Sequence, residues 1–196
     1  MKVITPEWEE FSKELDGIIL DKNFNYAVHR VFKSTITTPL NINTQICCKR
    51  IEYIKKYFEN IHTVLEIGPG IGNMCRILYN EFDIRTYTIC DIESMFRITK
   101  FWLQKYKINN INFISADNYV EMVNNNYDLC ISFSCLSEIP EYMRNFVINN
   151  INKVSRLVFF IDYFSEAEEN LLLKSYSNYE IIPEITTGQK GYLLWR

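Results

Sequence analysis

The chain has 196 residues, and its 21 basic and 24 acidic side chains give a net charge of −3 with a pI near 5.5. This length suits one α/β domain with a substantial core and is too short for a second full domain. The acidic balance argues against nucleic acid as a partner, and no apolar stretch approaches the roughly 18 residues that span a bilayer. The first ten residues are acidic and lack the apolar segment of a signal peptide. We therefore expect a cytoplasmic protein that binds neither nucleic acid nor a membrane.

The six cysteines show no pattern that would predict a metal site. They form no Cys-x-x-Cys pair, and no histidine stands at zinc-ligand spacing from them. Cys90 and Cys130 fall within predicted buried strands, where a free thiol packs as a small apolar group. We expect a reduced compartment and no bound metal.

Residues 1–60 have helical patterns. A first short helix is predicted from Pro6 to Asp16, and a longer one begins where Asn43 or Thr44 can cap it. The apolar stripe of this longer helix consists of Ile46, Ile51, Ile54 and Phe58. No Ser/Gly/Pro-rich linker follows, so we interpret residues 1–60 as a helical cap on the domain formed by residues 61–196.

A strand that ends in an acid and opens into alternating glycines is the most informative stretch. Thr63 to Ile67 has the β-branched content of a buried strand, with Glu66 near its end, and a helix is predicted from Gly72 to Glu81. Between them, Gly68-Pro69-Gly70-Ile71-Gly72 allows unusual backbone angles and lets a flat ligand lie against the main chain near a helix N-terminus. The spacing differs from the Gly-x-Gly-x-x-Gly dinucleotide fingerprint. A carboxylate beside the turn would repel a pyrophosphate and attract the ammonium of an amino-acid cofactor.

This motif resembles that of the class I S-adenosylmethionine-dependent methyltransferases, in which a strand ends in Glu or Asp before Gly-x-Gly-x-Gly. Glu66, Gly68, Gly70 and Gly72 match it position by position. The resemblance implies S-adenosylmethionine as cofactor, with S-adenosylhomocysteine as product. It also implies a Rossmann-like fold for residues 61–196.

The remaining elements alternate as that fold requires. Strands are predicted over Arg85–Cys90, Ile111–Ile114, Tyr127–Ser132, Arg156–Ile161, Tyr179–Ile185 and Gly191–Trp195. Helices are predicted over Ser94–Tyr106, Glu141–Val154 and Glu166–Tyr176. We expect an α/β, doubly wound, mostly parallel seven-stranded sheet with an antiparallel last strand.

The carboxyl ends of the strands should hold the cofactor, because ligands of open α/β sheets bind there. Asp91 follows the second strand and can accept hydrogen bonds from two ribose hydroxyls, with Ile92 beside it; a helix N-cap is its other interpretation. The resemblance implies that Asp117 and Asn118 meet the adenine. Phe133 and Ser134 follow the fourth strand, and Phe133 is expected on the adenine or beside the methyl group.

A narrower resemblance concerns the acceptor. Asp91-Ile92-Glu93, Phe101-Trp102-Leu103 and Cys135-Leu136-Ser137-Glu138-Ile139-Pro140 resemble a family of predicted sugar O-methyltransferases. Glu93 stands where that family usually has proline, and Ile139 where it usually has methionine. The resemblance implies transfer of a methyl group to a hydroxyl of a small molecule, plausibly a sugar or glycan precursor.

A hydroxyl acceptor needs a general base, and two residues are candidates. Glu138 follows the fourth strand, although a helix-cap or salt-bridge role fits it equally well. His29 is the second candidate, although a lone histidine is more often a core residue. Tyr26, Arg30 and Tyr163 could line the acceptor pocket. A magnesium-assisted variant would use Glu138 and Asp162, but the expected Asp-Asn pair is missing after the fifth strand.

Other functions stay open at this point. The acceptor could be an amine, which makes the chain an N-methyltransferase or another small-molecule methyltransferase. The fold could also serve a non-catalytic binding or scaffold protein, although the acids at the strand ends argue for a retained cofactor. A dehydrogenase is less consistent with the glycine spacing. The expected partner is the small-molecule acceptor. A homodimer with a second copy of the chain also stays open.

Overall fold

The computed structural model describes residues 40–183 and 189–196. The predicted first helix and His29 therefore lie outside the described residues, as do Tyr26 and Arg30. Within the described part, no helix is both long and apolar enough to cross a membrane.

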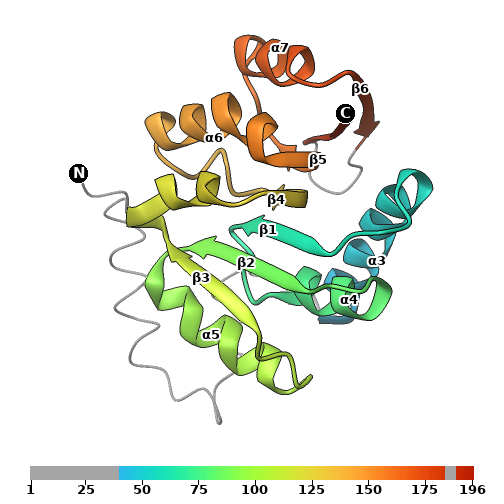
Figure 1. Ribbon diagram of the computed structural model, residues 1–196, viewed down its shortest axis with the longest axis vertical. Coiled ribbons are helices and arrows are strands. Elements are labelled where there is room, and N and C mark those ends of the chain that lie inside the picture. The colour runs from blue at the N-terminus through green and yellow to red at the C-terminus, as the bar shows by residue number, and fades with distance from the viewer. Residues whose placement is uncertain (1–39, 184–188) are drawn as a thin grey trace.

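A seven-stranded sheet forms the centre of the fold, in the order β3-β2-β1-β4-β5-β7-β6 (Figure 1). Its strands are β1 (Thr63–Ile67), β2 (Thr86–Asp91), β3 (Ile111–Ser115), β4 (Tyr127–Phe133), β5 (Ser155–Asp162), β6 (Asn178–Pro183) and β7 (Lys190–Trp195). The pairings among β1 to β5 are all parallel, whereas β7 runs antiparallel to both of its neighbours. The carboxyl ends of β1 to β5 consequently lie along one side of the sheet. We call this side the carboxyl edge, as distinct from the outer strands β3 and β6.

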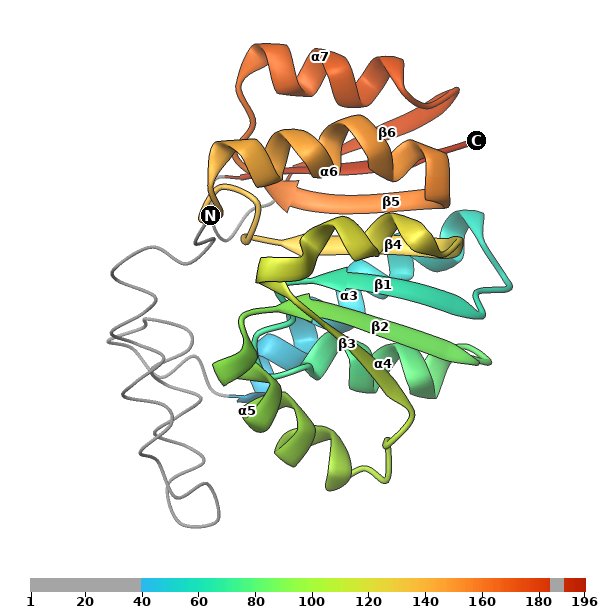
Figure 2. The ribbon, with the colours of Figure 1, turned by 60° about the vertical axis from the view of Figure 1, so that its left-hand side comes forward.

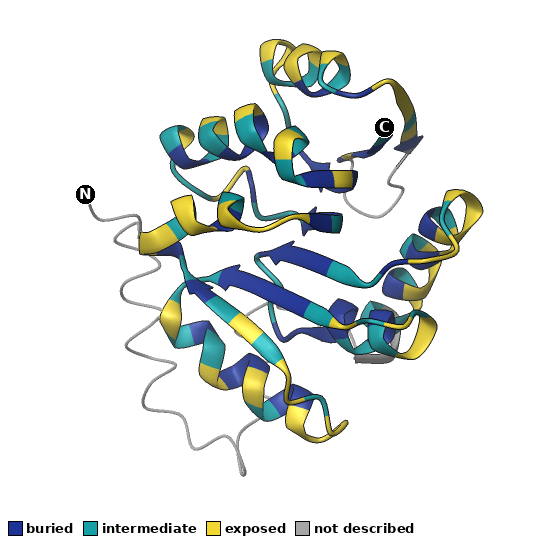
Figure 3. Cartoon of the chain, in the orientation of Figure 1, coloured by how far each residue is buried: buried dark blue, intermediate teal, exposed yellow. Residues whose placement is uncertain are grey.

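Helices cover both faces of the sheet (Figures 1 and 2). One face carries α3 (Leu40–Tyr57), α4 (Asn73–Glu81) and α5 (Glu93–Gln104); the other carries η1 (Ala116–Asn124), α6 (Glu141–Val154) and α7 (Glu166–Lys174). Each face has its own apolar cluster: Ile54, Leu78 and Ile98 pack with the first, and Met143, Ile148 and Leu172 with the second. Burial of these side chains against the strands stabilises the sandwich, and exposed residues lie on the outer sides of the helices (Figure 3).

Helix α3, which precedes β1, packs against the C-terminal strands β6 and β7. Tyr57 of α3 stacks on Trp195 of β7 with ring centroids 4.4 Å apart, and its hydroxyl donates to Glu180 of β6 at 2.5 Å. The middle of the helix buries Ile51 and Ile54 in the first cluster. This helix therefore packs across the sheet from the glycine turn to the C-terminal strands.

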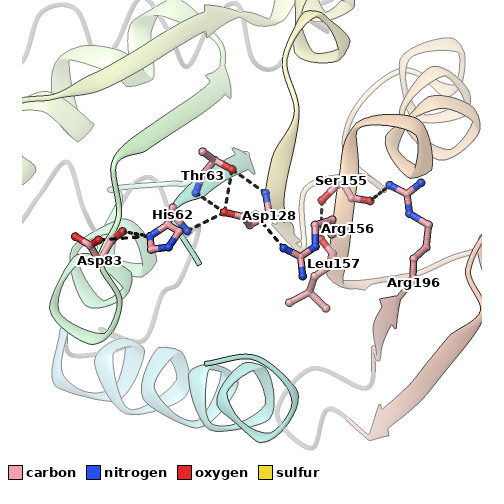
Figure 4. A network of polar contacts seen from close by, with 8 residues as sticks. All are labelled: His62, Thr63, Asp83, Asp128, Ser155, Arg156, Leu157 and Arg196. Atoms are coloured by element: carbon pink, nitrogen blue, oxygen red, sulfur yellow. Dashed lines mark hydrogen bonds and ion pairs between the residues drawn. The ribbon is translucent and has the colours of Figure 1, made fainter. Parts of the chain in front are cut away.

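The opposite edge of the sheet is held by a polar network around Asp128 of β4 (Figure 4). Oδ2 of Asp128 accepts hydrogen bonds from His62 N at 2.9 Å, Thr63 N at 3.0 Å and Thr63 Oγ1 at 3.2 Å. Arg156 Nη1 lies 3.5 Å from the other carboxylate oxygen. Burial raises the pKa of Asp128, but these contacts outweigh it, so the pKa is lowered overall. His62 thus belongs to the edge away from the carboxyl ends of the strands.

The predicted sheet and the alternation of elements are confirmed, and two local features differ. Asn43 and Thr44, predicted to cap the longer N-terminal helix, lie inside it, because the chain is already helical at Leu40, the first described residue. Residues 116–124, expected to include only a turn at 116–118, form the short helix η1 with a kink at Asn118, where φ is −109° and ψ is 26°. Periodicity could not reveal this nine-residue element, because 3₁₀ geometry does not repeat every 3.6 residues.

Candidate functional site

The turn between β1 and α4 uses its three glycines in the left-handed region. Gly68, Gly70 and Gly72 have φ of 68°, 57° and 83°. Gly68 N donates to Cys90 O at 3.0 Å, which ties the turn to the end of β2, and Gly72 N donates to Pro69 O at 2.9 Å. Because L side chains are disfavoured at these angles, the turn depends on glycine for its backbone path.

Two of these glycines also allow close packing. A Cβ on Gly68 would lie 2.3 Å from Cys135 Sγ, and one on Gly72 would lie 2.8 Å from the Thr99 methyl carbon. Thr99 Oγ1 donates to Gly70 O at 3.0 Å, so α5 also holds the turn. Helix α5 and the loop that follows β4 thus both lie directly against the glycine turn. The sequence did not indicate the Cys135 contact, because 67 residues separate it from Gly68.

Glu66 is buried, with 3% of its surface exposed. Its Oε2 accepts a hydrogen bond from the buried Tyr87 hydroxyl at 2.7 Å. Burial raises the pKa of Glu66 to about 7; the Tyr87 hydrogen bond opposes this rise, and the nearby Asp91 charge adds to it. The motif predicted this acid, but nothing in the sequence indicated its tyrosine partner.

Asp91 ends β2 beside the glycine turn and is half-buried. Its Oδ1 accepts a hydrogen bond from Ile92 N at 2.7 Å. Burial raises the pKa of Asp91 to about 7, and the Ile92 hydrogen bond opposes that rise. The helix N-cap weighed as its other interpretation is not what the structure shows, because Ile92 is the N-cap of α5 and no side-chain hydrogen bond caps that helix.

Asp117 and Asn118 lie exposed at the start of η1, after the end of β3. Asp117 N lies 3.4 Å from Ser115 Oγ, the weak cap of this helix. The structure therefore brings both residues to the carboxyl edge, next in the sheet order to Asp91. Their contact with an adenine stays a prediction.

The loop after β4 carries the other predicted side chains. The central carbon of the Arg50 guanidinium lies 4.4 Å from the centroid of the Phe133 ring. The same ring is edge-on to Phe159, with the two ring centroids 5.2 Å apart. Phe133 thus packs toward α3, which the sequence did not indicate. Ser134 has a φ of 58°, and its hydroxyl donates to Gln189 Oε1 at 2.7 Å. Glu138 lies exposed in the following turn.

A buried polar cluster connects α3 to the glycine turn. Asn73, the first residue of α4, donates to Asn43 Oδ1 at 2.7 Å and to Thr44 Oγ1 at 3.1 Å. Arg76 Nε donates to Asn73 Oδ1 at 2.9 Å. We call these four residues the α3–α4 cluster. A sequence analysis could have noticed an asparagine directly after Gly72, but its partners lie about 30 residues earlier.

Asp162 ends β5 at the same edge, and its side chain is buried with 1% of its surface exposed. Tyr163 N donates to its Oδ1 at 2.8 Å, and Tyr163 itself is 57% exposed. Across residues 40–183 and 189–196, no three His, Cys, Asp or Glu side chains gather as a metal site would require. Asp162 and Glu138 therefore find no third ligand of that kind in the described chain.

No protein-family model matches the chain, and no curated protein matches it either. Solved structures do. The chain is 13% identical to a candidate O-methyltransferase of Nostoc punctiforme PCC 73102, with a TM-score of 0.65 over 78% of this chain and 56% of that one. For magnesium protoporphyrin IX methyltransferase of Synechocystis PCC 6803 with bound SAM, the identity is 14%, the TM-score 0.64 and the coverage 91% and 95%. For the N-methyltransferase NodS of Bradyrhizobium japonicum WM9 with SAH, they are 12%, 0.61, and 88% and 96%.

These likenesses decide the architecture. The chain has the Rossmann-like methyltransferase fold. It spans 56% of the Nostoc protein and 39% of another neighbour, EvdMO1, so those proteins contain further parts. Identities of 10% to 14% across the neighbours distinguish neither O- from N-methylation nor one acceptor from another.

Proposed function

We propose that the chain is an S-adenosylmethionine-dependent methyltransferase that methylates a hydroxyl of a small molecule, with a sugar or glycan precursor as the first acceptor class to test. The observation that carries the cofactor assignment is the geometry of the glycine turn, whose three glycines have left-handed backbone angles and whose Gly68 and Gly72 have no room for a Cβ. Two acids, Glu66 and Asp91, adjoin that turn. Three of the structural neighbours hold SAM or SAH, which supports the same cofactor here.

The residues present fit this cofactor. Glu66 would attract the ammonium group, and Asp91, whose Oδ1 accepts from Ile92 N, would also accept hydrogen bonds from the ribose hydroxyls. Asp117 and Asn118 would contact the adenine. Pro69, Ile92 and Ser134 would line the site between the adenine, the ribose and the ammonium group. When bound, the cofactor supplies an electrophilic methyl group, and the protein supplies mainly positioning and exclusion of water.

The first experiment is a calorimetric titration with S-adenosylmethionine and S-adenosylhomocysteine. We expect micromolar binding by the native chain and loss of binding in both variants. Asp91→Ala removes the carboxylate that would accept hydrogen bonds from the ribose, and Gly70→Arg fills the turn. Asn149→Ala is the matched control, since Asn149 is exposed on α6 and donates only to the backbone of its own helix, at Asn145 O. A well-folded native protein that binds neither ligand would refute the assignment and favour the scaffold alternative.

Glu138 is the proposed general base, and His29 is the second candidate. Glu138 is exposed next to the loop that contacts Gly68 through Cys135, a position from which it could reach an acceptor. Glu138→Gln should lower the turnover of a hydroxyl acceptor at least 100-fold with little change in cofactor affinity, because only proton removal is lost. Transfer of a labelled methyl group to a panel of sugars measures this.

An amine acceptor is the alternative, since NodS, a neighbour with the same fold, is an N-methyltransferase. A free amine has its own lone pair and can lose its proton to water, so Glu138→Gln would then reduce turnover only slightly. The same assay, run with amines, separates the two outcomes.

A further inference from the structure

Asp162 carries a buried oxygen without a hydrogen-bond partner among residues 40–183 and 189–196. Its Oδ1 accepts the hydrogen bond from Tyr163 N, whereas Oδ2 finds no donor in that part of the chain. Buried carboxylate oxygens normally accept hydrogen bonds, and leaving one without a donor destabilises a fold. Ser132, on the neighbouring strand β4, has a buried hydroxyl that likewise finds no partner among the described residues.

Asp162 lies where the carboxyl ends of the parallel strands meet, as Asp91 does. Asp162 is the last residue of β5, and Ser134 N donates to the carbonyl of the residue before it, Ile161, at 2.7 Å. The Cys135 thiol, which packs on Gly68, experiences the charges of Asp91, Asp162 and Glu138. Asp162 therefore lies at the same end of the sheet as Asp91, and the charges of both act on the Cys135 thiol.

Two basic side chains near the end of β5 are paired with acids other than Asp162. Lys190, the register partner of Asp162 on β7, has its ammonium 3.3 Å from both Glu169 oxygens. Arg144 Nε donates to Glu168 at 2.6 Å. An unpaired buried carboxylate favours a ligand that brings a positive charge and an N–H donor.

We propose that Asp162 is an acceptor-binding residue whose Oδ2 receives a hydrogen bond from a protonated amine on the methyl acceptor. This deepens the proposed function and rests on it: the acceptor becomes a small hydroxylated amine, such as an amino sugar. A protonated nitrogen has no lone pair, so the amine anchors the molecule while a hydroxyl elsewhere on it is methylated. The Ser134–Gln189 hydrogen bond joins the segments on both sides of the end of β5.

Asp162→Asn tests the inference first through stability, which needs no ligand. The amide keeps the acceptor for Tyr163 N and exchanges the oxygen without a donor for an NH2 group, so we expect the melting temperature to change by no more than about 2 °C. Asp128→Asn is the matched control, because that carboxylate has backbone and hydroxyl donors on one oxygen and Arg156 near the other. It should melt about 4 °C lower or more, because it loses acceptors that are in use. A fall for Asp162→Asn as large as that for Asp128→Asn would show a structural carboxylate and overturn the proposal.

The second measurement is saturation-transfer NMR with glucosamine, galactosamine and ethanolamine, in the presence of S-adenosylhomocysteine. We expect saturation of at least one amine by the native protein, none of N-acetylglucosamine, and at least a tenfold loss of signal in Asp162→Asn. Failure of all three amines to bind, or equal binding by the variant, would overturn the proposal. Calorimetry with S-adenosylhomocysteine runs alongside, so that loss of the cofactor site itself is recognised separately.

Discussion

At the scale of single residues, Gly68 tests the packing of the cofactor turn. Gly68→Ala places a Cβ in the left-handed region, which costs about 1–2 kcal/mol, and presses it against the Cys135 side chain, which costs about 1–3 kcal/mol more. We expect unfolding in urea to show a loss of about 3 kcal/mol. In a Cys135→Gly background, the same substitution should cost only the backbone part. An equal loss in both backgrounds would mean that Cys135 does not limit the turn.

Glu66 makes stability depend on pH. Its pKa is raised from about 4.5 in the unfolded chain to about 7 in the folded one, so the folded state holds the proton more tightly. Its contribution is therefore most favourable below about pH 4, declines as pH rises through 7, and costs about 3 kcal/mol above that. The stability of Glu66→Gln relative to the native chain should rise between pH 5 and 8, as urea unfolding at each pH would measure. A difference that stays constant with pH would contradict this.

At the scale of elements, the α3–α4 cluster determines how the N-terminal helix meets the glycine turn. Asn73→Ala removes the buried amide that joins Asn43, Thr44 and Arg76, and leaves their polar groups without it. We expect a loss of about 1–3 kcal/mol in urea unfolding and weaker S-adenosylhomocysteine binding, because α4 begins at this residue. Asn149→Ala, on the exposed side of α6, should change neither. Unchanged cofactor affinity in a destabilised Asn73→Ala would limit the cluster to a structural role.

The elements that could be predicted are those with a strong local pattern. Thr63–Ile67 and Glu141–Val154 have the bounds predicted for them, because apolar content and periodicity reflect burial directly. The motif likewise indicated Glu66 and the three glycines. What could not be predicted depends on contacts between distant segments: Cys135 against Gly68, Tyr87 on Glu66, and Arg50 over Phe133. A single sequence holds no local trace of such pairs.

At the scale of the whole molecule, the cofactor turn lies where β1, β2, α4, α5 and the loop after β4 meet, so ligand binding should stabilise all of them together. A ligand at 100 times its dissociation constant adds about 2.7 kcal/mol to the free energy of unfolding if it binds only the folded state. For a chain of this length, that corresponds to a rise in melting temperature of about 5–10 °C with S-adenosylhomocysteine, measured by calorimetry. Asn149→Ala should show the full rise. Gly70→Arg should show none, because the arginine occupies the turn; an equal rise in that variant would mean that the ligand binds elsewhere on the molecule.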